Sequence, residues 1–514
     1  MFGEESSLIA ARFAQLAHER GAEPAMTFRG DERKATHDPT GTLAYDFSKF
    51  WRRVERVTGH LQSTWGVRPG DRVAWLGFNH ELQLVTLVAC ARLGAVFLPL
   101  NFRLAVPELQ QVIGDAQPRL LVHDTLHAQT AQALHHAGLE HTHQDALIAS
   151  ASPRGRVLPD VHSKLPLLLV YTSGTTGLPK GAVHTQAGLL ANARASQWAH
   201  GFVSGDKLLS TLPMFHVGGL CIQTLPALLA GVEVVLHPRF DPSAWLDEMH
   251  TSRPTLSLLV PATMRAVFEH PRWVDTSLAC LRGIMTGSST VPRAYLDTWH
   301  ARGVPVGQVY GTTETGPVSI VLRLPDAIAR VGTSGWPQPE AQVKLIDPQG
   351  REVGPGETGE VCIRAANVMR GYWNAQGTPG VGLQDGWFHS GDLAQCGEDG
   401  CITIVGRSKD MIISGGENIY PAEIENILVT LPGVAECAVV GLPDARWGEV
   451  PVAVLVRVAS ATGQALSQSS VLTHLQERIA RFKLPRRVLF MDSLPKSALG
   501  KVQKAQLQAQ LQET

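Results

Sequence analysis

The sequence predicts an α/β protein with a large N-terminal part of layered β-sheets with helices, and a smaller α+β part at the C-terminal end. Short apolar runs alternate with helix-length segments over most of the chain, as expected when buried sheets lie between helices. After Gly335 the pattern changes to β-like runs separated by turns. The last stretch again mixes strands with helices, which indicates a separate small unit.

The expected elements follow in chain order. Apolar runs predict strands at Arg72–Leu76, Ala95–Leu100, Leu120–Val122, Leu167–Tyr171, Val232–Leu236 and Leu256–Val260. Helical spacing predicts helices at Phe47–Leu61, His80–Leu93, Val106–Asp115 and Gln186–Gln197. The β-like runs that follow are Val343–Asp347, Glu360–Arg364 and Cys401–Val405. The final unit is expected to contain helix Pro421–Thr430, strands Glu436–Val440 and Val452–Val458, helix Ser470–Phe482 and strand Arg487–Met491.

Length and composition narrow the class of protein. A chain of 514 residues, 44% of them hydrophobic, is long enough for two or more domains. The net charge of −1 predicts no broad basic surface for nucleic acid. Seven cysteines without a C-x-x-C pair, and an N-terminus without a basic leader, indicate reduced thiols in the cytoplasm. The apolar stretch Leu82–Leu100 contains Gln83, Arg92 and Gly94, which favours a buried helix and strand over a membrane span.

The run from Tyr171 to Gly181, YTSGTTGLPKG, is the most informative feature of the chain. It follows an apolar strand-like run and combines hydroxyl side chains, glycines and one lysine. Glycines let backbone N–H groups turn toward one point, while hydroxyls and an ammonium add further donors. This combination predicts a cradle for phosphate oxygens. It differs from the common P-loop, which requires G-x-x-x-x-G-K-[ST].

This run resembles the phosphate-binding loop of the adenylate-forming superfamily, which includes acyl-CoA synthetases, luciferases and the adenylation domains of peptide synthetases. Three further runs match superfamily motifs in the same order: Gln308–Glu314, Ser390–Asp392 and Pro495–Lys501. The resemblance covers nearly the whole chain from Leu43 onward. It is closest to bacterial fatty-acyl or aryl-CoA synthetases.

The resemblance implies a site for ATP and Mg²⁺. A carboxylate and a triphosphate are both anions, so joining them requires charge neutralisation and in-line placement. The resemblance places Tyr310 against adenine, Asp392 on the ribose hydroxyls, Thr313 on the α-phosphate and Glu314 on Mg²⁺. The implied ATP-binding residues are Thr172, Ser173, Gly174, Thr175, Thr176, Lys180, Gly287, Ser288, Gln308, Tyr310, Gly311, Thr312, Thr313, Asp392, Arg407 and Lys501.

The same resemblance implies a mobile C-terminal domain. It divides the chain into an N-terminal adenylate-forming domain, 1–408, and a C-terminal domain, 409–514, with Lys409 as the hinge. Lys501 is implied to be the catalytic lysine, with His216, Thr313 and Glu314 as the other catalytic residues. After adenylation the C-terminal domain would rotate, and a thiol would attack the acyl-adenylate.

Coenzyme A is the co-substrate that the run Met411–Pro421 implies, because this run closely resembles bacterial acyl-CoA synthetases. The implied CoA-binding residues are Gly415, Gly416, Trp447 and Phe482. A nearby basic cluster would suit the phosphates of the coenzyme, although a solvated helix face is the alternative reading. The cluster comprises Arg478, Arg481, Lys483, Arg486 and Arg487.

The acyl pocket is implied by the run Pro213–Leu220, which matches an aromatic–histidine motif. Its expected lining is His216, Val217, Gly218, Gly287, Val309 and Thr312. Three positions depart from frequent family residues: Ser288-Ser289 replaces small apolar residues, Val309 replaces glycine and Thr312 replaces methionine. The pocket should therefore be narrower and more polar, so that a medium-chain or aromatic acid fits about as well as a long fatty acid.

Three other patterns are rejected as sites. Gly354–Gly359 satisfies G-x-G-x-x-G, but it contains a proline and precedes a β-like run rather than a helix. Phe240–Ser243 resembles an amino-acid-binding motif of peptide synthetases, but it lies in a connection. The histidines between Ala128 and Arg156 have no spacing that fits a metal site, so they are expected to be solvated.

These observations predict an ATP-dependent carboxylate–CoA ligase. It would activate a fatty or aromatic acid as acyl-adenylate, release pyrophosphate and transfer the acyl group to CoA. Three alternatives stay open: loading of a carrier protein, a monooxygenase of luciferase type, and an inactive nucleotide sensor. The expected partners are the acid, ATP and CoA, with no nucleic acid and no transmembrane segment. Peripheral membrane contact and a homodimer also stay open.

Overall fold

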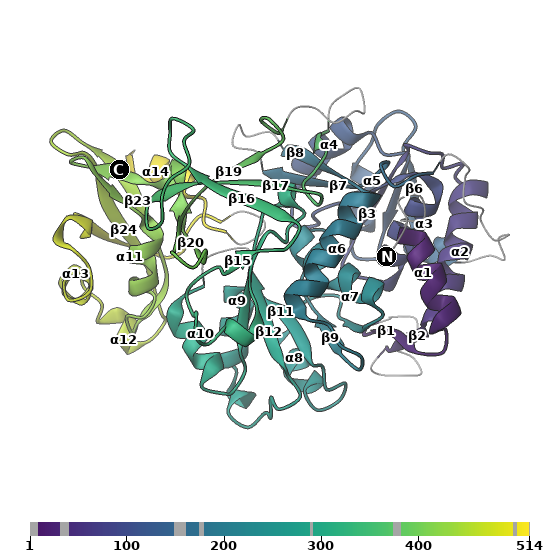
Figure 1. Ribbon diagram of the computed structural model, residues 1–514, viewed down its shortest axis with the longest axis horizontal. Helices are drawn as coiled ribbons and strands as arrows, with labels where there is room; N and C mark the ends of the chain where they lie inside the picture. The colour runs from purple at the N-terminus through teal and green to yellow at the C-terminus, as the bar shows by residue number, and fades with distance from the viewer. Residues whose placement is uncertain are drawn as a thin grey trace.

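The computed structural model describes residues 9–30, 41–148, 161–173, 179–287, 291–373, 382–496 and 501–512. Within these ranges the strands form four sheets of nine, seven, four and five strands, called here the first to fourth sheets. Figure 1 shows the chain running from purple N-terminal helices at one end of the molecule to a yellow-green C-terminal unit at the other.

The first sheet places the ends of several parallel strands along one edge. Its strands are β1 (Pro24–Phe28), β2 (Leu43–Asp46), β9 (Lys207–Ser210), β10 (Glu233–Leu236), β11 (Leu256–Leu259), β12 (Gly283–Gly287), β13 (Val306–Tyr310), β14 (Ile320–Leu322) and β15 (Trp336–Pro337). Strands β9 to β13 pair in parallel, and β12 and β13 are neighbours with Gly287 opposite Val309. The carboxyl ends of such strands are the usual place for a ligand.

The second sheet carries the residues that flank the predicted phosphate loop. Its strands are β3 (Arg72–Leu76), β4 (Val96–Pro99), β5 (Leu120–His123), β6 (Glu140–His143), β7 (Pro166–Ser173), β8 (Pro179–Thr185) and β18 (Gly371–Tyr372). Strands β7 and β8 are antiparallel and bring Thr172 opposite Lys180. The short strand β18 pairs with β8, so Tyr372 lies on the edge of this hairpin.

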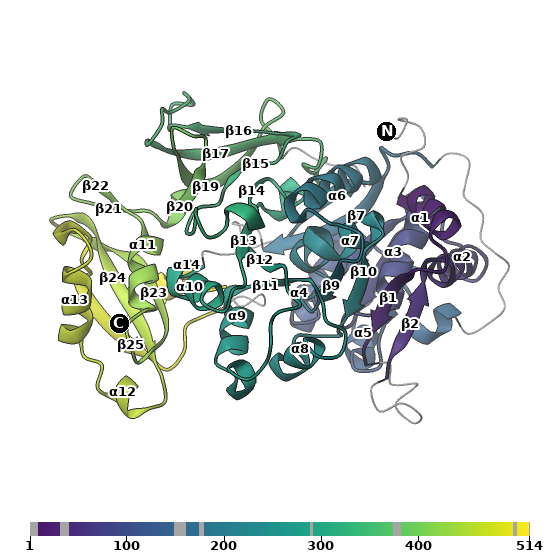
Figure 2. The same ribbon diagram turned by 60° about the horizontal axis from the view of Figure 1, so that its bottom comes forward.

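The third and fourth sheets meet near the predicted hinge. The third consists of β16 (Ala341–Ile346), β17 (Thr358–Ala365), β19 (Phe388–Cys396) and β20 (Ile402–Arg407). The fourth consists of β21 (Ile412–Ser414), β22 (Glu417–Ile419), β23 (Val434–Asp444), β24 (Gly448–Arg457) and β25 (Arg487–Met491). The domain boundary predicted at Lys409 lies between β20 and β21. Figure 2 shows the third sheet standing apart from the two large sheets, with the C-terminal unit beside it.

Helices complete the layers on both sides of the sheets. The largest apolar core joins the first and second sheets through α1 (Ile9–Glu19), α2 (Phe47–Ser63), α3 (Glu81–Leu93), α6 (Gln186–His200) and α7 (Leu225–Ala230). A second core lies under α8 (Pro242–Glu248), α9 (Pro261–Phe268) and α10 (Arg293–His300), and a third under α4 (Val106–Ala116) and α5 (Ala128–Ala133). In the C-terminal unit, α11 (Pro421–Leu428) and α13 (Gln468–Gln476) cover one face of the fourth sheet and α14 (Lys504–Gln512) covers the other, while α12 (Ala461–Gln464) lies in a connection.

The apolar stretch Leu82–Leu100 forms a buried helix followed by a buried strand, as predicted. Every residue of α3 is buried, and Gly94 ends the helix in a left-handed conformation, with φ of 65°. Strand β4 then enters the second sheet. None of the helices in the described ranges has the length and apolar character of a membrane span.

Most predicted elements are present, but the predicted helix Ser470–Phe482 is too long. Helix α13 ends at Gln476, and Arg481–Lys483 forms a separate 3₁₀ turn. Ala480 between them is extended, with a φ of −61° and a ψ of 146°, so the helix does not continue into that turn. Phe482 is 44% exposed, so it does not extend the buried apolar face of the helix.

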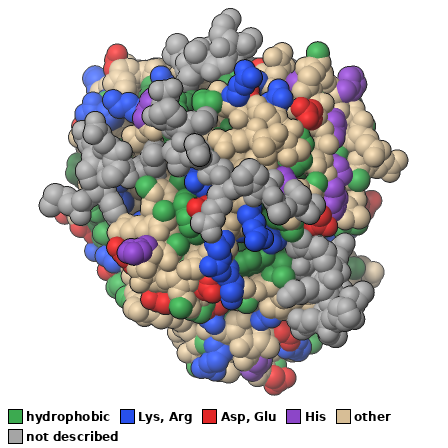
Figure 3. Space-filling model, turned by 90° about the vertical axis from the view of Figure 1, so that its right-hand side faces the viewer, with side chains coloured by type: hydrophobic (Ala, Val, Ile, Leu, Met, Phe, Trp, Pro, Cys, Tyr) green, Lys and Arg blue, Asp and Glu red, His purple; other side chains and the backbone are tan. Residues whose placement is uncertain are grey.

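The surface carries charges of both signs. On the face drawn in Figure 3, basic side chains form short stripes with acidic side chains beside them, and hydrophobic and other residues separate the stripes. This mixture accords with the balance of 45 basic and 46 acidic residues.

Candidate active site

The ends of β13, β19 and β20 bring three predicted nucleotide residues into direct contact. Tyr310 Oη donates a hydrogen bond to Asp392 Oδ2 at 2.9 Å, and Arg407 Nε donates to Asp392 Oδ1 at 2.6 Å. Asp392 and Arg407 are opposite each other in the antiparallel register of β19 and β20. Burial and the neighbouring Asp392 carboxylate raise the pKa of Tyr310 well above its ordinary value. Although burial opposes it, the same carboxylate raises the pKa of Arg407.

A bend in β19 presents the Asp392 carboxylate to this site. Gly391 has a φ of 69°, a conformation that favours glycine. Ser390 Oγ donates to the Val361 carbonyl and accepts from the Asp392 amide, at 2.7 and 3.0 Å. The carboxylate is therefore held by its own strand as well as by Tyr310 and Arg407.

Tyr372, which the sequence analysis missed, lies against both Glu314 and Lys180. Tyr372 Oη donates to Glu314 Oε1 at 2.9 Å, and Lys180 Nζ lies 5.5 Å from the centre of the Tyr372 ring. Burial, and then the Glu314 carboxylate, raise the pKa of Tyr372, so its hydroxyl stays a donor. Tyr372 follows Gly371, which adopts a φ of 144°. That Gly-Tyr pair was the available sequence signal.

Lys501 faces the same group of residues from the C-terminal unit. Although Lys501 keeps solvent-accessible surface, the protein around it lowers its pKa by desolvation, and Arg407 lowers it further. Asp392 and Glu314 act in the opposite direction. Asp392, Glu314 and Arg407, all in the N-terminal part, therefore interact electrostatically with the Lys501 ammonium. Lys496, five residues earlier in the same run, pairs instead with Glu436 at 2.6 Å.

His216, in the run that predicts the acyl pocket, is also affected by the charge of Lys501. Its Nδ1 accepts a hydrogen bond from the Gly218 amide at 3.0 Å. Burial, and then the charge of Lys501, lower the pKa of His216 to about 4. The ring is therefore neutral at pH 7, and its single proton is on Nε2 because Nδ1 accepts. His216 can donate one hydrogen bond from Nε2.

Close backbone packing explains the glycine in the adenine-flanking run. A Cβ on Gly311 would lie 1.8 Å from the Pro317 carbonyl oxygen, so only glycine fits. The next residues form a 3₁₀ turn, Thr313–Thr315, that carries Glu314, and Thr313 is buried there. Gln308 lies on β13 opposite Thr286.

The predicted acyl-pocket residues occupy the same edge of the first sheet. Val217, Gly218, Gly287 and Val309 are buried, and Val309 is opposite Gly287. Thr312 Oγ1 is a buried hydroxyl without a hydrogen-bond partner among the described residues. Four of these residues are therefore packed in the interior, and Thr312 offers a polar atom that a bound molecule can satisfy.

Some predicted residues lie outside the part of the chain that the structure describes. These are Gly174, Thr175 and Thr176 of the phosphate loop, the side chain of Ser173, and Ser288. Thr172, on β7, donates to the Lys180 carbonyl at 3.5 Å.

The predicted CoA-binding residues Gly415 and Trp447 pack against each other. Gly415 has a φ of 60°, and a Cβ there would lie 2.6 Å from the Trp447 ring. Arg446 and Arg486 lie 4.9 and 5.5 Å from the same ring, which is itself 37% exposed. This exposed ring with two guanidinium groups suits a base and its phosphates.

The remainder of the basic cluster does not gather around this ring. Lys483 Nζ donates to both carboxylate oxygens of Glu423 at 2.7 Å, and Arg478 binds Glu477 and a backbone carbonyl. Phe482 is exposed, with the Lys483 ammonium over its ring. Gly416 lies in the turn before β22, and a Cβ built there would meet no atom within 4 Å. The prediction that Lys483 serves the coenzyme is therefore weakened by its ion pair.

The C-terminal unit is docked on the N-terminal part by a contact that the sequence did not signal. Arg265, on α9, donates from Nη1 to the Ala435 carbonyl of β23 at 2.5 Å. Its Nε pairs with Glu269 at 2.6 Å, which holds the side chain in place. Lys409 is exposed in the 3₁₀ turn Ser408–Asp410 between the two parts.

The rejected patterns have structural roles. Asp241 caps the N-terminus of α8 by accepting from the Ala244 amide at 2.8 Å. Glu357 accepts from the Gly354 amide at 2.7 Å and closes a turn before β17. Of the histidines between Ala128 and Arg156, His135 and His141 are exposed and His136 and His143 are half-buried.

Comparison with family models gives two matches. Residues 17–373 match the model described as AMP-binding enzyme, and residues 423–501 match the model of the AMP-binding enzyme C-terminal domain.

Comparison with individual proteins gives matches over nearly the full length. The chain is 45% identical to an indoleacetate–CoA ligase of Aromatoleum aromaticum, over 94% of this chain and 95% of that protein. It is 42% identical to a feruloyl-CoA synthase of an Amycolatopsis species, over 91% and 94%. Among solved structures, it resembles o-succinylbenzoate CoA synthetase of Bacillus subtilis in complex with its acyl-adenylate, with a TM-score of 0.85, 28% identity, and coverage of 96% and 97%.

Proposed function

The chain belongs to the AMP-binding enzyme family, and we propose that it is an ATP-dependent ligase that joins an aromatic carboxylic acid to coenzyme A. The class of enzyme is an AMP-forming acid–CoA ligase that uses ATP, Mg²⁺ and CoA. The aromatic substrate, the roles of individual residues and a cytoplasmic location are the proposal. The seven cysteines, all unpaired, support a reducing compartment.

In the first half-reaction, the acid carboxylate attacks the α-phosphorus of ATP and pyrophosphate leaves. Asp392, presented by the bend in β19, would accept the ribose hydroxyls, and Tyr310 would lie against the base. Lys501 would place its ammonium between the carboxylate and the α-phosphate as charge develops. The observation that carries this assignment is that Tyr310 and Arg407, from separate parts of the chain, both donate to the Asp392 carboxylate, at 2.9 and 2.6 Å. The charges of Arg407, Asp392 and Glu314 also act on Lys501.

The donor set suits Mg²⁺ at Glu314. Its carboxylate is a hard oxygen ligand, and Tyr372 orients it through one oxygen. A magnesium ion there would neutralise charge on the phosphate oxygens. Lys180, held near the same tyrosine, would neutralise the leaving pyrophosphate.

In the second half-reaction, the thiol of CoA attacks the acyl carbonyl and AMP leaves. We propose that the C-terminal unit first rotates about Lys409 and withdraws Lys501. The exposed Trp447, with Arg446 and Arg486 beside it, would then receive part of the coenzyme. Neutral His216 would donate from Nε2 at the junction of acyl group and nucleotide.

Unsatisfied polar atoms support an aromatic acid with a polar group over a plain fatty acid. A cavity of about 10 Å³ lies beside Gly219 and is lined by Ser210, Thr211, Gln223 and Thr224, among others. Gln223 Oε1 and Thr211 Oγ1 are buried there without partners among the described residues. The cavity has room for about one water-sized group, so it would take a donor at the edge of a substrate rather than its ring. A buried acceptor left unpaired costs about 1–3 kcal/mol, which a hydroxyl or an indole N–H at that edge would recover. An alkyl chain would not.

A panel of matched acids tests this proposal. Indoleacetate and a hydroxycinnamate should be better substrates than naphthaleneacetate, unsubstituted cinnamate or decanoate, measured as kcat/KM for pyrophosphate release and for thioester formation with free CoA. Gln223→Leu should lower kcat/KM for the acids with a donor by about 5- to 150-fold, the equivalent of 1–3 kcal/mol, and spare the apolar analogues. A wild-type preference for decanoate would reject the aromatic assignment. Pyrophosphate release without a CoA thioester would reject CoA as the thiol.

Removing the Tyr372 hydroxyl should weaken the magnesium-bearing part of the site. Tyr372→Phe keeps the ring near Lys180 but removes the hydrogen bond to Glu314. We expect kcat for adenylation to fall about 10- to 150-fold, because a hydrogen bond to a charged group is worth about 1.5–3 kcal/mol. The Mg²⁺ concentration needed for half-maximal rate should rise. An unchanged Mg²⁺ requirement would show that Glu314 needs no such support.

Loosening the docking contact should affect one half-reaction more than the other. Arg265→Ala removes the hydrogen bond to Ala435 that holds the C-terminal unit near Lys501. Adenylation, followed by ATP–pyrophosphate exchange, should fall by roughly 3- to 10-fold, in line with about 1 kcal/mol for one hydrogen bond. Thioester formation from supplied acyl-adenylate should not fall. Arg293→Ala is the control, because Arg293 pairs only with Asp297 on its own helix among the contacts described.

A further inference from the structure

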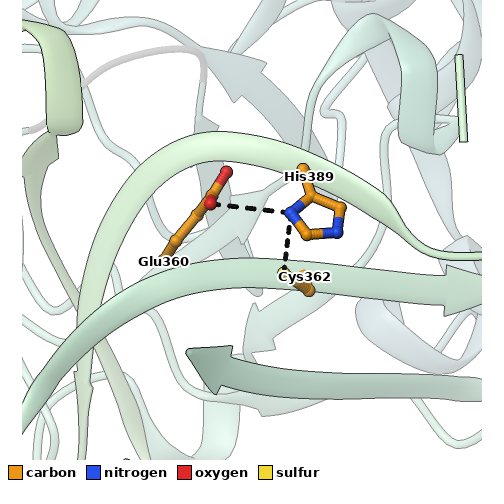
Figure 4. Close-up of side chains that lie close together, drawn as sticks. All are labelled: Glu360, Cys362 and His389. Atoms are coloured by element: carbon orange, nitrogen blue, oxygen red, sulfur yellow. Dashed lines mark hydrogen bonds and ion pairs between the residues drawn. The ribbon is translucent and has the colours of Figure 1, made fainter. Parts of the chain in front are cut away.

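Three side chains with metal-binding atoms lie together on the third sheet, beside the bend of β19 that presents Asp392. Figure 4 shows Glu360 and Cys362 on one strand facing His389 on the next. Within the described residues, this is the group of histidine, cysteine and carboxylate side chains whose donor atoms all lie within 4.8 Å of one another. Cys362 and His389 are opposite each other in the antiparallel pairing of β17 and β19.

The spacing of the donor atoms matches a zinc site. Cys362 Sγ is 3.5 Å from His389 Nδ1, and Glu360 Oε2 is 3.6 Å from the same nitrogen. Around a tetrahedral Zn²⁺ with ordinary bond lengths, sulfur and nitrogen ligands are separated by about 3.5–3.6 Å, and nitrogen and oxygen ligands by about 3.3–3.4 Å. The two distances to His389 Nδ1 therefore already suit one ion, and the third, between Cys362 and Glu360, lies within 4.8 Å.

The protein already orients these donors. The other oxygen of Glu360, Oε1, accepts from the Gly391 amide at 3.0 Å, so an ion on Oε2 leaves that hydrogen bond intact. Cys362 is fully buried in the sheet. The Glu360 and His389 side chains are 29% and 27% exposed, which gives an ion a route from solvent. Fixed ligands lose little conformational freedom on binding.

A single imidazole nitrogen cannot satisfy both neighbours in the metal-free cluster. Neutral Nδ1 either accepts from the thiol or donates to the carboxylate, but it cannot do both. A divalent cation would bind all three atoms at once. Lys344, opposite Cys362 on β16, is the nearby positive charge, and its ammonium is held 4.5 Å from the centre of the Trp387 ring.

We propose that Glu360, Cys362 and His389 form a zinc site with three protein ligands and a fourth position open to solvent. One thiolate, one imidazole and one carboxylate make a donor set of intermediate softness, which suits Zn²⁺ rather than Mg²⁺ or Ca²⁺. Binding breaks the thiol S–H bond, forms a Zn–S bond and releases one proton to the buffer. The site is separate from the magnesium ligand Glu314.

Metal titration of the full-length protein tests the proposal. Chelator-treated protein is titrated with Zn²⁺ against a chromophoric chelator, and separately with Co²⁺. Wild type should bind one equivalent more than His389→Gln or Cys362→Ser, or bind it at least about tenfold more tightly. Its Co²⁺ complex should show the near-ultraviolet absorption of a cobalt–thiolate bond, and Cys362→Ser should abolish that band.

Two variants keep the test decisive. Cys396→Ser, a partly exposed cysteine on the same strand β19, should titrate like wild type. His389→Gln alters a partly exposed side chain, so it should keep the wild-type thermal unfolding even if Cys362→Ser loses core packing. Identical Zn²⁺ titrations of wild type and His389→Gln, or a Co²⁺–thiolate band that survives Cys362→Ser and disappears in Cys396→Ser, would overturn the proposal.

Discussion

Lys501→Ala should lower the rate of adenylation by about 100- to 1,000-fold while leaving thioester formation from supplied acyl-adenylate near the wild-type rate. Losses of this size follow when one preorganised donor to a developing negative charge is removed. The charges of Arg407, Asp392 and Glu314 act on the Lys501 ammonium, which supports a place for it beside the nucleotide residues. The loss should be in kcat rather than in KM, because the charge it stabilises develops in the transition state.

Single-turnover measurements separate the two half-reactions. ATP–pyrophosphate exchange reports adenylation, and purified acyl-adenylate with CoA reports thiolation. Lys496→Ala is the matched control: this lysine is five residues earlier, pairs with Glu436 and should give wild-type rates in both assays. Equal losses in both half-reactions of Lys501→Ala would contradict the proposed withdrawal of the lysine before thiolation.

Lys409→Pro should have the opposite effect, sparing adenylation and lowering thioester formation on the order of 100-fold. Proline holds φ near −65°, a value compatible with the 3₁₀ turn that Lys409 occupies in the observed arrangement. It would prevent the large backbone rotation that a hinge requires. Displacement of reacting groups by even about 1 Å can cost a factor of this order.

Lys409→Ala is the control for the hinge experiment, because it removes the charge and keeps φ free. Its two half-reactions should stay close to wild type. Acyl-adenylate should accumulate in Lys409→Pro and be detectable by mass spectrometry of the quenched enzyme. Full turnover by Lys409→Pro at the wild-type rate would remove Lys409 from the hinge role.

The buried elements of the fold could be predicted from local patterns. The apolar run Arg72–Leu76 is β3 with the predicted bounds, and Arg487–Met491 is β25. Strand β3 is buried from Val73 to Leu76, and β25 buries Val488, so apolar side chains mark both strands in the sequence. The prediction failed at the surface: helix Ser470–Phe482 ends at Gln476, because Ala480 is extended and Phe482, which continues the apolar spacing, is exposed.

Tyr372 and Arg265 could not be predicted, because their partners are distant in sequence. Tyr372 contacts Glu314 across 58 positions, and Arg265 contacts Ala435 across 170. No local sequence pattern around Tyr372 or Arg265 indicates which residue it contacts. The ion pair of Lys483 with Glu423, which spans 60 positions, could not be predicted for the same reason.

The sequence by itself determined the class of chemistry and the order of its parts: the phosphate-loop run, the carboxylates Glu314 and Asp392, and the terminal Lys501. Each consists of side chains or glycines that the reaction requires within a short stretch, so it can be recognised in the sequence alone. Only the tertiary structure decided which of these charges meet. Strand register places Arg407 opposite Asp392 and Cys362 opposite His389. Register and domain docking depend on hydrogen bonds and packing between distant segments, and no short stretch of sequence contains them.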